Sequence, residues 1–132
     1  MAFKTFFNFL ILAGVLFTSL PSVSNSQEGE DVKHGRKVFL RCKFCHDVKP
    51  TSANKVGPNL ENIMGRTAGS LERYQTYSKA LKESGIIWSP ETLNQWLQNP
   101  LGFLPGNKMA FSGVLYEKDR NNLIAYLQSL SN

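Results

Sequence analysis

The sequence has few of the residues and patterns that mark several common classes of protein. Its 132 residues include only two cysteines and two histidines, whereas a structural zinc site needs four ligands, usually from two cysteine pairs. Beyond the first 26 residues there is no internal repeat or low-complexity block, and strand patterns are weak. The basic residues are dispersed rather than gathered into a run or stripe, which argues against a nucleic-acid binder.

The two cysteines lie in one short motif, Cys42-x-x-Cys45-His46. This spacing is the haem-attachment signature of c-type cytochromes, in which each thiol bonds a haem vinyl group and the histidine supplies an axial nitrogen. Three other interpretations stay open at this stage. A thioredoxin-like pair would need a βαβ pattern, a zinc site would have to recruit the remote His34, and a disulfide between Cys42 and Cys45 would leave His46 unexplained.

The N-terminal segment has the order of a secretory signal peptide. Lys4 gives a short positive region, an apolar run follows over Phe6–Leu20, and a serine-rich stretch comes next. We therefore predict a signal peptide over residues 1–26, with cleavage before Gln27 or, alternatively, after Ser24. Such a signal exports the domain to the periplasm.

The remaining segment, 27–132, is long enough for one domain and no more. Without Lys4 it carries fourteen Lys and Arg against ten Asp and Glu, a net charge of about +4. This mildly basic, dispersed charge fits docking to an acidic protein partner. The alternative is a membrane-anchored protein that faces the periplasm, but the apolar run is shorter than the ~20 residues of a bilayer span.

Apolar spacing and capping residues predict an all-α fold of four or five short helices joined by long loops. The predicted helices are Asp31–Arg41, Ser78–Ser84, Ser89–Asn99 and Glu117–Leu130, with a short turn at Leu60–Met64. Ser78 and Ser89 are the expected N-caps, and Pro100 is expected to end the third helix. The loops are too long for an ordinary core of this size, which indicates a large ligand in the middle.

The segment after residue 26 contains two methionines, Met64 and Met109. Met64 lies at helical spacing from Leu60 and is most simply a core residue. Met109 lies in the loop Leu104–Phe111, where proline and glycine fix an unusual backbone path that can aim a thioether at one point. A thioether favours ferrous iron, so a His/Met ligand pair suits an electron carrier.

These motifs together resemble those of class I cytochromes c, of the mitochondrial and alphaproteobacterial type. The resemblance covers about Asp31 to Leu130. It is carried by the ordered motifs Gly35-Arg-Lys-Val-Phe39, Cys42-x-x-Cys-His46, Gly57-Pro-Asn-Leu60, Gly65-Arg66, Tyr77-Ser78, Gly85-Ile-Ile-Trp88, Asn99-Pro100, Pro105-Gly-x-Lys-Met109-x-Phe111, Arg120 and Leu123–Leu127.

The resemblance implies a cytochrome c fold wrapped around one covalently bound haem c, and a role for each of eight residues. Cys42 and Cys45 would bind the haem vinyl groups, and His46 and Met109 would be the axial ligands of the iron. The carbonyl of Pro58 would accept a hydrogen bond from the proximal imidazole. Arg66, Tyr77 and Trp88 would donate to a buried haem propionate.

Other positions follow from the same resemblance. Gly35 and Phe39 would meet Tyr126 where the first and last helices cross. A basic ring around the haem edge would include Arg41, Lys43, Lys55 and Lys108. Departures from the family pattern, at which we expect changes in tuning or docking, are Trp96, Leu81, Asn107 and Leu101-Gly102.

The function that the resemblance implies is electron transfer in the periplasm rather than enzymatic turnover. Electrons would pass from a quinol–cytochrome c oxidoreductase to a terminal oxidase or similar partner. We expect a monomer that binds redox proteins, without nucleic acid and without stable membrane insertion once the signal is cleaved. The alternative is a haem peroxidase-like or gas-binding cytochrome, in which the bond to Met109 would be labile.

Overall fold

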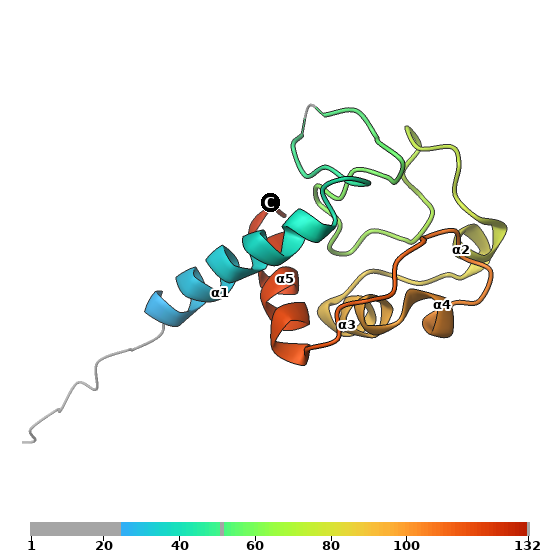
Figure 1. Ribbon diagram of the computed structural model, residues 1–132. Helices are drawn as coiled ribbons and strands as arrows, with labels where there is room; N and C mark the ends of the chain where they lie inside the picture. The colour runs from blue at the N-terminus through green and yellow to red at the C-terminus, as the bar shows by residue number, and fades with distance from the viewer. Residues whose placement is uncertain (1–24, 51, 132) are drawn as a thin grey trace, which may run out of the picture.

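A computed structural model describes residues 25–50 and 52–131, and every regular element in these residues is helical (Figure 1). The elements are α1 (Asn25–Val38), the 3-10 helix η1 (Phe39–Arg41), α2 (Lys79–Glu83), α3 (Pro90–Gln98), α4 (Pro100–Phe103) and α5 (Glu117–Ser129). The only pairing of extended backbone among the described residues is an isolated antiparallel bridge between Thr67 and Ile87. The predicted all-α class is confirmed.

The predicted signal peptide lies, up to residue 24, outside the described residues. Helix α1 begins at Asn25, six residues before the predicted start, and therefore includes the position of the predicted cleavage before Gln27. Its α-helical part ends at Val38, and the last turn tightens into η1, which leads directly to Cys42. In the part of the chain that the structure describes, no helix is both long and apolar enough to cross a bilayer.

Helices α1 and α5 cross in close contact, as Figure 1 shows. Gly35 makes the crossing possible, because a Cβ atom built on it would lie 2.5 Å from the carbonyl carbon of Asn122 and 2.8 Å from Cβ of Tyr126. One turn later, the rings of Phe39 and Tyr126 pack with their centroids 5.6 Å apart. The expected contact of Gly35 and Phe39 with Tyr126 is therefore confirmed.

Side-chain caps start α2 and α3 where the sequence predicts them. The Ser78 hydroxyl accepts from the Leu81 N–H at 3.1 Å, and Gly85 follows α2 with a φ of +64°. At α3, Ser89 accepts from the Thr92 N–H at 3.2 Å while the Thr92 hydroxyl accepts from the Ser89 N–H at 2.8 Å. This reciprocal pair satisfies two backbone donors that the first turn would otherwise leave unpaired.

Pro100 ends α3 but also begins α4, which was not expected. The carbonyl oxygen of the Asn99 side chain accepts from the Gly102 N–H at 3.0 Å, so Asn99 caps a second short helix at once. A proline at N1 loses no intrahelical hydrogen bond. The chain thus turns sharply after α3 and carries the following loop back toward the protein interior.

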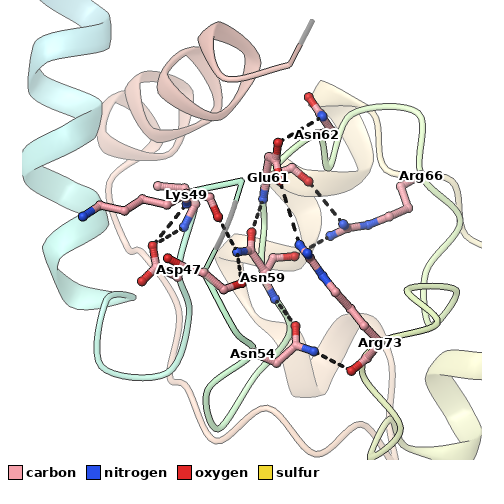
Figure 2. A network of polar contacts seen from close by, with 10 residues as sticks. Asp47, Lys49, Asn54, Asn59, Glu61, Asn62, Arg66 and Arg73 are labelled. Carbon is pink, nitrogen blue, oxygen red and sulfur yellow. Dashed lines mark hydrogen bonds and ion pairs between the residues drawn. The ribbon is translucent and has the colours of Figure 1, made fainter.

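The described residues of the long segment between η1 and α2 form no helix, and a buried asparagine holds the first half of this segment together (Figure 2). The Asn59 amide donates to the carbonyls of Lys49 and Ser52 at 2.9 and 3.2 Å, and its oxygen accepts from the Glu61 N–H at 2.8 Å. The Asn59 N–H donates to the Asn54 side chain at 3.0 Å. This segment forms one wall of the site.

Candidate functional site

All eight residues that the sequence selects for the site line one cavity of about 330 Å³. They come from the turn after η1, the long segment, the start of α3 and the loop after α4: Cys42, Cys45, His46, Pro58, Arg66, Tyr77, Trp88 and Met109. Much of the remaining lining is apolar, including Leu93, Leu97, Leu123 and Leu127. The volume falls at the lower end of the range for ligand cavities in proteins.

The two thiols lie on one turn at the cavity wall. The N–H groups of Cys45 and His46 donate to the Cys42 carbonyl at 3.0 and 2.9 Å. Both thiols are free, so the disulfide interpretation is not supported. Burial raises the pKa of Cys42 to about 11, opposite to the lowered pKa of a redox-active C-x-x-C pair.

Zinc binding also fails on geometry. Among the residues that the structure describes, no group of three or more His, Cys, Asp or Glu side chains is placed to hold a metal ion. His34, the remote fourth ligand of that hypothesis, instead lies 3.0 Å from the Asp119 carboxylate on α5.

His46 is buried and oriented by one strong contact. Its Nδ1 lies 2.7 Å from the Pro58 carbonyl, and because a carbonyl can only accept, Nδ1 carries the proton. Burial lowers the pKa of His46, which favours the neutral imidazole that can bind a metal. Gly57 packs against the ring: a Cβ built there would lie 2.8 Å from Nδ1. The unprotonated Nε2 is left as the nitrogen able to coordinate iron.

All four residues expected in the basic ring around the haem edge are exposed, but two of them also bond other parts of the chain. The Lys55 ammonium donates to the carbonyls of Lys43 and His46 at 2.8 and 3.2 Å, and lies 3.3 Å from the Asp47 carboxylate. It therefore fastens the Cys-His turn to the following loop. The Arg41 guanidinium donates to the Gly113 carbonyl at 3.2 Å.

Lys43 and Lys108 differ from Arg41 and Lys55 in their side-chain contacts. Within the part of the chain that the structure describes, their ammonium groups make neither a hydrogen bond nor an ion pair, whereas Arg41 and Lys55 do. Of the four candidates, they are the ones that fit a docking role.

Arg66 is half-buried between the long segment and the cavity. Its guanidinium donates to the carbonyls of Asn59 and Glu61 at 3.1 and 3.2 Å (Figure 2). Burial lowers the pKa of Arg66. Burial raises the pKa of Tyr77, and the positive charge of Arg66 partly opposes that rise. Arg66 has five N–H donors, so it can hold the loop and still donate to an anionic group in the cavity.

An aromatic cluster also lines the cavity. Trp88 and Trp96 are both buried and pack edge to face with their ring centroids 5.4 Å apart, and Phe103 packs on Trp96 at 6.3 Å. Trp96, which replaces a tyrosine of the family pattern, therefore lines the cavity as part of a stack. Its indole N–H can donate but cannot accept.

Met64 and Met109 lie in different surroundings, as the sequence predicts. Met64 packs against the core and does not line the cavity, whereas Met109 does. The chemistry of the lining fits a c-type haem: two free thiols, an oriented neutral imidazole, a thioether, donors for a carboxylate and apolar walls. Sequence reasoning missed Lys55, Asn59 and Asn107 as organisers of this site, because their contacts depend on how the loops fold.

Comparison with known proteins agrees with this assignment. The cytochrome c family model matches residues 32–131. Cytochrome c of Gibberella zeae is 48% identical over 101 residues, covering 76% of this chain and 94% of that protein. Cytochrome c2 of Rhodomicrobium vannielii is 43% identical over 106 residues, covering 80% and 83%. The solved structure of cytochrome cH from Methylobacterium extorquens superimposes with a TM-score of 0.70 at 39% identity, covering 75% and 98%. The chain belongs to the cytochrome c family, as a class I cytochrome c that binds haem c covalently.

Proposed function

We propose that the protein is a periplasmic one-electron carrier in which His46 and Met109 are the axial ligands of a haem iron and Cys42 and Cys45 hold the ring. The observation that carries the proposal is the convergence of these four side chains on one apolar cavity. When bound, the haem supplies exchange of a single electron between ferrous and ferric iron.

The protein's part is to hold its two ligands in a form suited to that exchange. The Pro58 carbonyl fixes the His46 tautomer and makes the imidazole a better electron donor. The Met109 thioether is soft and stabilises ferrous iron, which raises the reduction potential. If His46 and Met109 both held the iron, oxygen and peroxide would have no open site, which favours electron transfer over the peroxidase-like or gas-binding alternative.

Arg66, Tyr77 and Trp88 are proposed as donors to a haem propionate. A carboxylate taken out of water needs hydrogen bonds and opposite charge. Arg66 supplies the charge, and Tyr77 lines the same cavity close enough for the positive charge of Arg66 to act on its pKa. The buried Trp88 supplies an indole N–H from the edge of α3.

Members of the cytochrome c family act with redox partners, and the rim of the cavity is the proposed docking surface here. Phe44 and Val56 line the cavity yet are 84% and 69% exposed. Two exposed cations lie next to the proposed haem-binding residues in the sequence: Lys43 follows Cys42, and Lys108 precedes Met109. A quinol–cytochrome c oxidoreductase is the proposed donor and a terminal oxidase the proposed acceptor, with docking that weakens as salt rises. Residues 1–26 are proposed as the export signal.

One set of spectra on the mature chain, produced with a haem-attachment system, tests the proposal. The expected result is a mass increase of one haem, a c-type reduced spectrum and a methionine–iron charge-transfer band in the ferric form. Absence of covalent haem would overturn the proposal. Haem without that band, together with ready binding of carbon monoxide by the ferrous form, would favour the gas-binding alternative.

A further inference from the structure

The loop that presents Met109 to the cavity is organised by one side chain, Asn107. The Asn107 amide donates both of its N–H groups, to the carbonyls of Pro100 and Leu104 at 2.9 and 2.8 Å. Its oxygen accepts from the Met109 N–H at 2.8 Å. A single half-buried side chain thus ties the backbone of Met109 to the α4 region.

The anchor at the other end of this tie is rigid. Pro100 is fully buried, begins α4 and lies two residues after the end of α3. Two backbone bonds hold the loop, from the Leu104 and Asn107 N–H groups to the Pro100 and Leu104 carbonyls at 3.0 and 3.2 Å, but neither of them includes Met109. Gly106 takes a φ of +85°. Removal of the Asn107 side chain would therefore free the Met109 backbone while leaving α4 in place.

We propose that Asn107 is a positioning residue that fixes Met109 at the cavity and so sets how firmly Met109 holds its axial position. This inference rests on the proposed function, in which Met109 is an iron ligand. Both N–H groups of Asn107 already donate to backbone carbonyls. Asn107 therefore acts through Met109 rather than by donating to a haem propionate.

The physical argument concerns the cost of opening the loop. An external ligand can replace Met109 only if the loop moves, and movement breaks the contacts of Asn107. Each net hydrogen bond corresponds to about a fivefold change in an equilibrium constant. Loss of two or three of them should let an external ligand bind about 25-fold more tightly or better.

The test uses the haem-loaded protein and titrates its ferric form with imidazole, following loss of the methionine–iron band. Asn107→Ala should bind imidazole at least about 25-fold more tightly than the unmodified protein, and its ferrous form should bind carbon monoxide faster. Asn107→Ser should lie between the two, because its hydroxyl can still accept from the Met109 N–H. Asn121→Ala is the matched control, since Asn121 is exposed and its side chain bonds, among the described residues, only that of Asn94.

Denaturant unfolding of the same variants separates positioning from general stability. If Asn107→Ala and Asn107→Ser unfold more easily but bind imidazole with unchanged affinity, the positioning role is overturned while the proposed function stands. If the unmodified protein itself lacks the methionine–iron band, the axial role of Met109 fails and the inference fails with it. Should Asn107→Ala not fold, the imidazole affinity of Asn107→Ser decides alone.

Discussion

Replacement of Gly57 by alanine is expected to displace the His46 ring and destabilise the protein. The added methyl group would lie 2.8 Å from Nδ1 and 2.9 Å from Nε2 of that ring, and closer still to Cε1. Such distances are well inside van der Waals contact, so the ring must move. Any movement disturbs the 2.7 Å contact between Nδ1 and the Pro58 carbonyl.

The size of the effect follows from three terms. Overpacking of a buried site costs about 1–3 kcal/mol, and weakening a buried hydrogen bond costs about 1 kcal/mol more. The Gly57 backbone lies outside the left-handed region, so alanine adds no backbone strain and stabilises by about 0.4–1 kcal/mol through the unfolded chain. The net expectation is a loss of about 1–3 kcal/mol.

Guanidinium unfolding of the haem-loaded protein measures this loss. Gly29→Ala is the matched control, because Gly29 lies in α1 and an added Cβ would have no atom within 4 Å apart from its chain neighbours and the backbone of its own helix. The control should be neutral or up to about 1 kcal/mol more stable, since alanine is the better helix former. Equal stability of the two variants would refute the close packing of Gly57 on His46.

Three further predictions concern the crossing helices, the buried imidazole and the basic residues. Gly35→Ala should lower the free energy of unfolding by about 1–3 kcal/mol, because the new methyl group meets backbone atoms of α5; a thermal midpoint equal to that of the unmodified protein would contradict the contact. In a His34→Gln variant, His46 is the remaining histidine. The free energy of unfolding of this variant should fall as the pH drops below 6.5, by at most about 1.4 kcal/mol per pH unit. The sign follows because burial lowers the pKa of His46, so the unfolded chain takes up the proton first; a flat profile between pH 5 and 6.5 would count against it. Lys55→Gln should cost about 1 kcal/mol of stability, whereas Lys108→Gln should leave unfolding unchanged and reduce the salt dependence of electron transfer to an acidic partner; the reverse pattern would refute the division between them.

Much of the site could be predicted from the sequence because its chemistry is local. The Cys42-x-x-Cys45-His46 spacing places both thiols and the imidazole on one turn, and the turn is found as expected. The acceptance of the His46 hydrogen bond by Pro58 was also predictable, since the resemblance implies it and a rigid Gly-Pro pair leaves a carbonyl free. Helix ends at Ser78 and Ser89 follow from capping chemistry in the same way.

What the sequence did not predict depends on contacts between distant segments or on competing local signals. The sequence predicted only a surface cation at Lys55, yet its ammonium donates to the carbonyls of His46 and Lys43, nine and twelve residues away. Pro100 was expected only to end the helix before it, but the side chain of Asn99 caps a new helix, α4, that begins at Pro100. The role of Asn107 appears only once the loop has folded back toward Pro100. Such contacts carry no periodicity that a sequence pattern could show.

The most direct test of the central claim compares Met109→Leu with Met64→Leu in the haem-loaded protein. Both changes conserve volume and should cost less than about 1.5 kcal/mol of stability, but only Met109 lines the cavity. We predict that Met109→Leu loses the methionine–iron charge-transfer band and has a lower reduction potential, because the thioether that favours ferrous iron is gone. Met64→Leu should keep both properties. An unchanged band and potential in Met109→Leu would contradict the assignment of Met109 as the axial ligand.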